Sequence, residues 1–376
     1  MDIDKTDKTD KTPMYQYIMN DIKRKISAGE LKPHDPLPTQ IELAKEYNTS
    51  EITSRRALSD LVQEGFVYRV RGKGSFVSEN PTSTGTQKIR TIYFAHRNYE
   101  VNTFNHPFFT DMFEGIKQVC DENEIAFYIW DMGENYELPD DPHAGIILLT
   151  MSEEFDLTRL TAWQEENRRI LTVHFYYPHL GIPYVIVDNL TGGYLATQHL
   201  LSLGHKRIGV ILTGNSIVDL NQEFSLRLQG YRLALSQHQL PFDSDLIAVM
   251  AGDHERVLMG EEGFRALMAL PDPPTAVFAT SDYKAIGAMN GARSLGMKIP
   301  EEISIIGFDD VKTSEYSYPR LSTINQNTRK LGERAAEILL FDLKDGENRL
   351  VKDEIVPTLV LRDSTAPISQ AKRQVK

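Results

Sequence analysis

The sequence predicts an α/β protein in two parts: a small N-terminal unit of helices and a hairpin, then a large unit of alternating strands and helices. Three observations support this division. A length of 376 residues exceeds what one ordinary hydrophobic core organises. Short helical patterns fill residues 13–78, whereas apolar strands alternate with amphipathic helices over residues 89–364. A small, polar stretch, residues 79–88, lacks apolar anchors and is expected to be a linker.

Composition restricts the classes of function. Hydrophobic residues make up 41% of the chain and charged residues 25%, which is typical of globular domains. The sequence contains no apolar run of about 18 residues, so we expect no membrane span. Residues 1–12 repeat Asp, Lys and Thr, which indicates a solvated arm rather than a secretory signal, and residues 365–376 are expected to be a tail. The single Cys120 predicts neither a disulfide nor a metal site, and together these features favour a cytoplasmic protein that needs no cofactor.

The negative charge of the chain is unevenly distributed. The formal net charge is −12, yet residues 1–80 hold 13 basic and 13 acidic side chains. The remaining 296 residues hold 28 basic and 40 acidic side chains and supply the whole excess. Binding to DNA requires local positive charge rather than a basic protein. The distribution is therefore compatible with DNA binding by the N-terminal unit and disfavours DNA wrapping around the large unit.

The first helix of the N-terminal unit is predicted from its periodicity. Ile18, Ile22 and Ile26 recur every four residues and form one apolar stripe. Gly29 is expected to end this helix. Three prolines within residues 33–38 keep the following segment out of a helix.

Two further helices are predicted from their N-terminal caps. Thr39 and Glu42 have the spacing of a capping box, and Ser50 is placed to cap the helix after it. At 100° per residue this third helix has one apolar face, formed by Ala57, Leu58, Leu61 and Val62. Arg56 and Ser59 project roughly opposite to that face, while Thr53 and Arg55 lie on its flanks.

A basic hairpin follows these helices. Residues 65–77 alternate as a strand pair, with Lys73 between two glycines at the expected tip. Glycine allows close approach to a phosphate backbone, and lysine neutralises phosphate charge. Two arginines on an amphipathic helix also fit an ordinary solvated face, but the cationic hairpin favours a winged helix-turn-helix that binds double-stranded DNA. The residues expected to face DNA are Thr39, Gln40, Ser50, Thr53, Arg55, Arg56, Arg71, Gly72, Lys73 and Gly74.

Residues 13–78 resemble the winged-helix domain of the GntR family of bacterial repressors. The match runs through residues 29–31, 37–39, 42–44, 50–58, 64–66 and 72–77. Two positions depart from the family, which often has arginine where Ile41 and Glu51 stand. The resemblance implies the DNA-binding fold, while these departures concern base preference.

The large unit alternates strands with helices, which predicts parallel sheets. The expected strands are 91–95, 126–130, 145–149, 170–174, 185–187, 207–212, 246–249, 276–280 and 303–307. The helices expected between many of them include 108–123, 190–203, 256–269, 282–295 and 328–341. In such sheets a ligand is expected at the carboxyl ends of the strands.

The large unit also resembles the LacI/GalR effector domain. The matching segments are 187–193, 199–209, 227–231, 274–287, 296–300, 303–310 and 319–326. The resemblance implies two subdomains with the fold of periplasmic sugar-binding proteins, a cleft for a sugar-like effector, and dimerisation through this domain. The whole chain is thus similar to the GntR/LacI chimeric repressors.

This resemblance implies a set of effector-binding residues. Arg227, Asp309 and Gln326 fall where the family binds ligand hydroxyls, while Phe108 and Phe109 begin a helix at the edge of the expected cleft. His174, His254 and Ser281 occupy positions that often carry other side chains in the family, which points away from a common hexose. Ordinary structural roles compete with these assignments: helix capping for Asp309, a surface ion pair for Arg227, and core packing for one of the phenylalanines.

Two other functions were weighed against this interpretation. An enzyme would have to use Asp309 and Asp310 as a carboxylate pair, but adjacent side chains at a strand end point in different directions, and no nucleophile or nucleotide-binding motif follows the first strand. A sugar-binding sensor without operator control would leave the winged helix unexplained. The sequence therefore predicts a homodimeric, ligand-responsive repressor.

Overall fold

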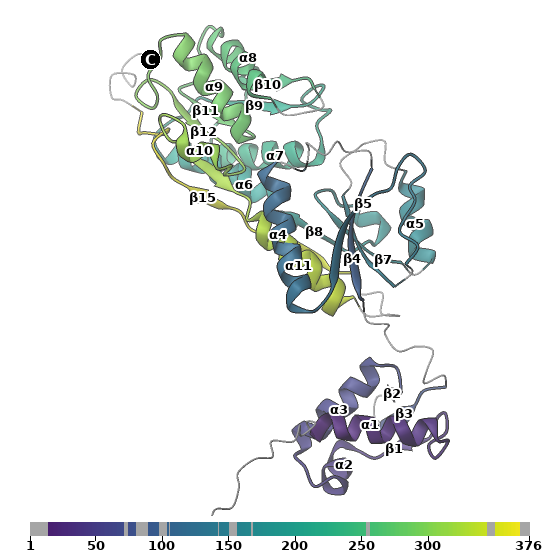
Figure 1. Ribbon diagram of the computed structural model, residues 1–376. Helices are drawn as coiled ribbons and strands as arrows, with labels where there is room; N and C mark the ends of the chain where they lie inside the picture. The colour runs from purple at the N-terminus through teal and green to yellow at the C-terminus, as the bar shows by residue number, and fades with distance from the viewer. Residues whose placement is uncertain are drawn as a thin grey trace, which may run out of the picture. The chain divides into compact units, whose positions relative to one another are not determined.

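The computed structural model describes most of the chain. Its described residues are 14–70, 74–79, 89–97, 104, 106–141, 143–149, 156–166, 168–252, 256–343 and 350–368. The chain divides into two compact units (Figure 1), and along the sequence the second unit begins at Ile89. The expected arm, residues 80–88 of the expected linker, and three residues of the expected wing tip lie outside the described residues, as does His254.

The N-terminal unit is a winged helix-turn-helix. Its helices are α1 (Met14–Ser27), α2 (Gln40–Glu46) and α3 (Glu51–Gln63). A small antiparallel sheet of order β1-β3-β2 consists of β1 (Pro36–Leu37), β3 (Gly74–Val77) and β2 (Val67–Val70). The isoleucine stripe of α1 packs against Leu43, Leu58 and Leu61, as its periodicity predicts.

Both predicted caps are present. The backbone N–H of Glu42 donates to Thr39 Oγ1 (3.3 Å) and the N–H of Thr39 donates to Glu42 Oε2 (2.8 Å), which completes the capping box. The N–H of Thr53 donates to Ser50 Oγ (3.1 Å) at the start of α3. These bonds satisfy backbone groups that the first turn of a helix leaves unpaired.

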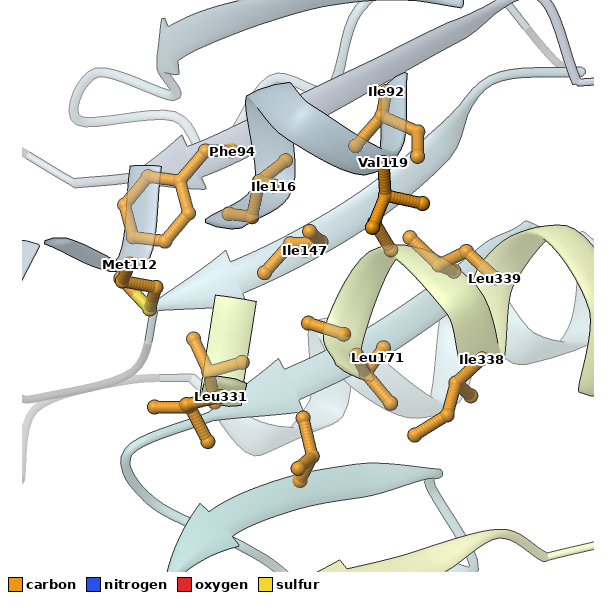
Figure 2. Close-up of a cluster of buried hydrophobic side chains, with 14 of the residues drawn as sticks. Ile92, Phe94, Met112, Ile116, Val119, Ile147, Leu171, Leu331, Ile338 and Leu339 are labelled. Carbon is orange, nitrogen blue, oxygen red and sulfur yellow. The ribbon is translucent and has the colours of Figure 1, made fainter. Parts of the chain in front are cut away.

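The N-terminal subdomain of the large unit has a parallel six-stranded sheet of order β14-β8-β7-β6-β4-β5. Its strands are β4 (Thr91–His96), β5 (Ala126–Asp131), β6 (Gly145–Leu149), β7 (Arg169–Val173), β8 (Tyr184–Val187) and β14 (Lys352–Ile355). Its helices are α4 (Pro107–Glu122), α5 (Leu157–Glu165), η2 (Pro178–Leu180), and α11 (Thr328–Glu337) with its π-helical extension η4 (Ile338–Asp342). Figure 2 shows the core between the sheet and the α4 and α11 helices, and a second core containing Leu160 and Trp163 of α5 covers the other face.

The C-terminal subdomain has a parallel four-stranded sheet of order β10-β9-β11-β12. Its strands are β9 (Ile208–Thr213), β10 (Ile247–Met250), β11 (Ala276–Ala279) and β12 (Ser304–Ile306). Its helices are α6 (Asn189–Ser202), α7 (Gln222–Gln237), η3 (Ser244–Leu246), α8 (Val257–Met268), α9 (Asp282–Ser294) and α10 (Thr313–Tyr316). Helices α6 and α7 pack on the face that includes Val210, while α8 and α9 pack on the face that includes Ile211.

The chain passes between the two subdomains three times. The crossings follow β8, follow β13 (Thr323–Asn325), and join β14 to β15 (Thr358–Val360). Strands β13 and β15 pair antiparallel. The strands predicted from sequence for this unit are present, with ends that differ by at most one residue, whereas β13, β14 and β15 were not predicted.

The C-terminal part of the large unit continues beyond residue 364. Thr365 Oγ1 lies 2.9 Å from His199 Nε2, and the carbonyl oxygen of Ala366 lies 3.0 Å from His205 Nε2. The N–H of Ile368 donates to the carbonyl of Leu203 (3.0 Å). Residues 365–368 therefore belong to the folded unit. Among the described residues, no helix has the length and apolar character needed to cross a bilayer.

Three helix pairs approach each other through reciprocal glycines. In each pair a Cβ added to either glycine would overlap a backbone carbonyl oxygen of the partner helix. The pairs are Gly115 with Gly332 (α4 and α11), Gly193 with Gly230 (α6 and α7), and Gly260 with Gly287 (α8 and α9). Figure 1 shows α4 and α11 lying side by side. The absence of side chains at these positions sets how closely the helices pack.

Replacing Gly193 with alanine is expected to destabilise the large unit. The new Cβ would overlap the carbonyl oxygen of Arg227, and backbone in a packed helix pair cannot move away cheaply. We expect a loss of about 1–3 kcal/mol in the free energy of unfolding, measured by urea denaturation. Gly291→Ala is the matched control, because its Cβ would come no closer than 3.0 Å to the Phe264 side chain and 3.3 Å to the carbonyl oxygen of Glu261, and it should therefore cost less. Equal losses in both variants would contradict the close-approach explanation.

Candidate functional site

Helix α3 presents one polar side to solvent. Ser54, Ala57, Leu58 and Leu61 are buried against the rest of the unit. The residues exposed on the helix are Glu51, Ile52, Arg55, Arg56 and Ser59. This division agrees with the face predicted from sequence, so the side chains expected to read DNA lie on the accessible side.

The two arginines of α3 are held differently. Arg55 Nε donates to Gln40 Oε1 (3.1 Å), which joins two of the predicted DNA-facing residues. The Arg56 guanidinium carbon lies 3.9 Å from the centre of the Tyr15 ring and Arg56 Nε lies 3.9 Å from Asp60 Oδ2. Arg56 is thus turned toward α1, whereas Arg55 lies beside α2.

The hydroxyls of the predicted interface take part in helix capping. Thr39 Oγ1 donates to Glu42 Oε2 (2.9 Å), and Ser50 Oγ lies 2.8 Å from Thr53 Oγ1. At the wing, Arg69 Nη2 donates to Ser59 Oγ (3.3 Å), which ties β2 to α3. Gly74 begins β3 with a φ of 116°, a conformation that favours glycine. Arg71, Gly72 and Lys73 lie outside the described residues.

Arg227 is the centre of a buried group of polar side chains in the large unit. It stands on α7 and is 2% exposed. Its Nε donates to Asn189 Oδ1 (2.8 Å), its Nη1 donates to the carbonyl oxygen of Thr280 (2.6 Å), and its guanidinium lies 3.8 Å from the centre of the Phe308 ring. These contacts fix the guanidinium beside the carboxyl end of β11, where a parallel sheet is expected to bind ligand.

Asp309 and Gln326 lie next to Arg227, as the family resemblance implies. Gln326 Nε2 donates to Asp309 Oδ1 (2.6 Å), and Arg227 Nη1 lies 3.9 Å from the same oxygen. Asp309 has a φ of 116°, which marks a strained backbone just after β12. The buried Gln326 Oε1 has no hydrogen-bond partner among the described residues, so it can accept a bond from a ligand hydroxyl.

His174 joins this group from the N-terminal subdomain. Its Nδ1 lies 3.0 Å from Glu223 Oε1, and its ring lies edge-on to Phe108 at 5.5 Å between centres. Arg227 Nη2 lies 3.6 Å from the same glutamate oxygen. We call His174, Glu223, Arg227, Asp309 and Gln326 the polar cluster.

Glu223 is ionised within this cluster. Burial raises the pKa of its carboxyl group, but the neighbouring His174 and Arg227 outweigh burial and lower the pKa to about 2. Lys284 adds to this effect. The lysine is fully buried on α9, where its Nζ donates to Thr213 Oγ1 (3.0 Å) and lies 4.2 Å from the centre of the Phe224 ring.

Further contacts join the two subdomains beside the polar cluster. The N–H of Tyr176 donates to Gln222 Oε1 (3.0 Å), and Gln222 Nε2 donates to the Tyr176 carbonyl (3.2 Å). The His106 ring meets the Tyr283 ring edge-on at 5.3 Å between centres. The subdomains are therefore in direct contact through a pair of hydrogen bonds and a ring contact.

The remaining predicted residues have other surroundings. Phe109 packs with Phe104 and Phe108 in the core of the N-terminal subdomain, as one of the two phenylalanines was expected to do. Ser281 caps α9, with its hydroxyl accepting the N–H of Lys284 at 3.4 Å. His254 lies outside the described residues.

Asp310 is separated in function from Asp309. It is bound by Arg362 Nη2 (2.7 Å) and by Asn325 Nδ2 (2.7 Å), whereas Asp309 is bound by Gln326. The two carboxylates thus have different partners and do not form an acid–base pair. The described residues also contain no group of three or more His, Cys, Asp or Glu placed to hold a metal ion.

Sequence reasoning missed three members of the site. Glu223 precedes Arg227 by one helical turn, and that i, i+4 spacing is the signal that could have revealed it. Gln222 and Lys284 carry no comparable signal, because an isolated polar side chain on a helix ordinarily faces solvent. Asp188, His199 and His205 have structural roles: Asp188 caps α6, and the two histidines form hydrogen bonds to neighbouring segments.

A winged helix joined to a two-subdomain α/β unit with a buried polar cluster defines the class of ligand-responsive DNA-binding proteins. Residues 14–77 match the family described as bacterial regulatory proteins, gntR family. Residues 197–365 match the periplasmic binding protein-like domain. The chain is 32% identical to the ribose operon repressor of Haemophilus influenzae over 83% of this chain and 92% of that protein. It is 27% identical to the arabinose metabolism transcriptional repressor of Geobacillus stearothermophilus over 95% and 98% of the two chains.

Solved structures have the same fold. A LacI family transcriptional regulator from Enterococcus faecium with bound ribose covers 74% of this chain and all of its own, with a TM-score of 0.61 and 25% identity. The regulator CelR in complex with cellobiose covers 87% of this chain with a TM-score of 0.62 and 22% identity, which supports the fold alone. The chain belongs to the GntR/LacI chimeric repressors, bacterial transcription regulators that join a GntR-type winged helix to a LacI-type effector domain.

Replacing Glu223 with glutamine tests the electrostatics of the polar cluster. We expect a loss of about 3 kcal/mol in the free energy of unfolding at pH 7, because Arg227 loses a buried counter-ion. The folded pKa of Glu223, about 2, lies below its ordinary value of 4.5. The carboxylate therefore stabilises the fold above pH 4.5, and this contribution disappears as the pH falls toward 2.

The wild type and Glu223→Gln should accordingly differ most near neutral pH and converge in acid, as measured by urea unfolding at a series of pH values. Glu261→Gln is the control, because it breaks an exposed i, i+4 pair with Arg265 and should change stability by less than about 1 kcal/mol. A pH-independent difference for Glu223→Gln would contradict an ionised Glu223.

Proposed function

We propose that this protein represses a carbohydrate-utilisation operon as a homodimer and that a sugar-like effector controls its affinity for the operator. The observation that carries the proposal is the buried polar cluster at the carboxyl ends of parallel strands, in a chain that begins with a winged helix. Relatives named for ribose and arabinose support a sugar. The protein acts in the cytoplasm, where a bacterial operator lies.

Two copies are proposed to bind one near-palindromic operator. A single winged helix covers one half-site, so a two-fold symmetric pair of heads matches a two-fold symmetric sequence. Residues 13–78 form each head, residues 79–88 link it, and the domain beginning at residue 89 mediates dimerisation. The DNA contacts are assigned to Thr39, Gln40, Ser50, Thr53, Arg55, Arg56, Arg71, Gly72, Lys73 and Gly74.

The effector is proposed to bind at the polar cluster between the two subdomains. Asp309 and the unpaired Gln326 Oε1 provide neighbouring acceptors for hydroxyl groups, and Arg227 provides donors. Phe108 provides an apolar edge beside His174. The other proposed effector-binding residues are Phe109, His254 and Ser281. The proposal contains no catalytic step, because Asp309 and Asp310 are bound by separate partners.

A ligand shifts the equilibrium between two conformations of a protein only if it binds one of them more tightly than the other. Residues on both subdomains form the cluster, so an effector would change how firmly the subdomains are held together. Thermal unfolding with ribose, arabinose, cellobiose and a nucleoside panel would identify the effector as the compound that raises the melting temperature. A gel shift with operator DNA, with and without that compound, then tests control; unchanged binding would reject it.

Arg55→Ala is expected to weaken operator binding about tenfold or more. One bidentate contact to a base is worth roughly 1–3 kcal/mol, and the exposed Arg55 lies on the reading side of α3. Arg56→Ala should weaken binding as well, and more equally across sequences if, as we propose, this arginine contacts a phosphate. Fluorescence anisotropy with labelled operator measures both, and Arg159→Ala on α5 serves as control. Unchanged affinity in both α3 variants would reject α3 as the reader.

Asp309→Ala should bind the operator normally yet lose the response to effector. Its carboxylate is expected to contribute about 1.5–3 kcal/mol to the free energy of effector binding through charge-assisted hydrogen bonds. Arg227→Ala should lose effector binding too, but it also removes one of the positive charges that compensate the buried Glu223. Calorimetry with the identified effector provides the measurement, and Asp363→Ala, which breaks an exposed pair with Arg320, is the control. Full effector affinity in Asp309→Ala would place the binding site elsewhere.

A further inference from the structure

An isoleucine lies uncovered on the side of α3 that faces away from the core. Ile52, the second residue of α3, is 76% exposed. The apolar side chains that the fold does bury on this helix, Ala57, Leu58 and Leu61, are at most 4% exposed. Single apolar residues are common on protein surfaces. Ile52 differs from such residues in its position on α3 and in its neighbours.

Ile52 belongs to the row of side chains assigned to base reading. It precedes Arg55 by three residues, so the two side chains are neighbours on one side of the helix. Arg55 in turn bonds Gln40 at the start of α2. The N-terminal residues of a recognition helix are the ones that approach base edges in the major groove. An aliphatic side chain thus occupies a position that base edges would meet.

The neighbours of Ile52 in the first turn have other partners or the wrong charge for a phosphate. Thr53 Oγ1 lies 2.8 Å from Ser50 Oγ in the cap of α3. Glu51 is acidic and exposed. Its negative charge is favourable at the N-terminus of a helix, but it would repel a phosphate. Ile52 is consequently the large apolar group that this turn offers to DNA.

The major groove contains one apolar group, the 5-methyl of thymine. Every other base edge there presents donors or acceptors, and an isoleucine laid over them would leave them without partners, which costs affinity. We propose that Ile52 contacts a thymine methyl and thereby sets part of the base preference of the operator. This inference rests on the proposed DNA-reading role of α3 and specifies its target.

The test removes the methyl from DNA and the side chain from protein. The full chain first selects its operator from a random double-stranded library. Each thymine of that operator is then replaced, one at a time, by deoxyuridine, which deletes only the 5-methyl and keeps base pairing. One position in each half-site should lose about fourfold in affinity, the value expected when a methyl-sized apolar contact is lost.

The variant Ile52→Ala should bind the unmodified operator about fourfold more weakly and should no longer respond to uracil at that one position. Its folding should be retained, because Ile52 is exposed, and thermal unfolding checks this. Ile52→Val, which keeps a branched apolar side chain, should retain the response. Ile129→Ala, at an exposed isoleucine of β5 in the large unit, should give the wild-type pattern throughout.

The outcomes separate this inference from the proposed function. An operator that is selected but insensitive to every thymine methyl overturns the inference alone. A methyl-sensitive position that persists unchanged in Ile52→Ala also overturns it, because another residue would then read that methyl. A full chain that selects no sequence overturns the DNA-reading role and the inference with it.

Discussion

The large unit depends on the buried guanidinium of Arg227. It bonds Asn189 at the start of α6 and the carbonyl oxygen of Thr280 after β11, and it stacks on Phe308. A buried cation is costly unless it is paired and hydrogen-bonded, and Glu223 and Asp309 supply the compensating charge. The same contacts that make burial of Arg227 possible also place its remaining donors, and the acceptors beside it, where a ligand can meet them.

Backbone packing positions that guanidinium. Gly193 of α6 lies against the backbone of Arg227 on α7, and Gly230 of α7 lies against Leu190, so the two helices pack too closely to allow a side chain at either glycine. This close packing of α6 and α7 places Arg227 at the carboxyl edge of the sheet, beside Thr280. The position of Arg227 therefore depends on two glycines, which have no side chain.

Much of the fold follows from periodicity, and less of the site does. Alternating apolar strands and capped helices predict the parallel sheets and the winged helix, because buried faces repeat regularly. Strands β13 and β15 have only three residues each and lie at the subdomain crossings, where no period can develop. Lys284 and Gln222 escaped prediction because their roles arise from tertiary contacts with Thr213 and Tyr176. The family resemblance was required to select Asp309 and Gln326.

One ligand site and one DNA site are proposed to be coupled within this chain. Coupling between two binding events is reciprocal, so an effector that changes operator affinity by some factor must have its own affinity changed by the operator by the same factor. The most direct measurement is calorimetric titration of the effector into the full-length protein, free and saturated with operator. Coupling predicts two different dissociation constants whose ratio matches the effector-induced change in operator affinity. Identical constants would contradict it.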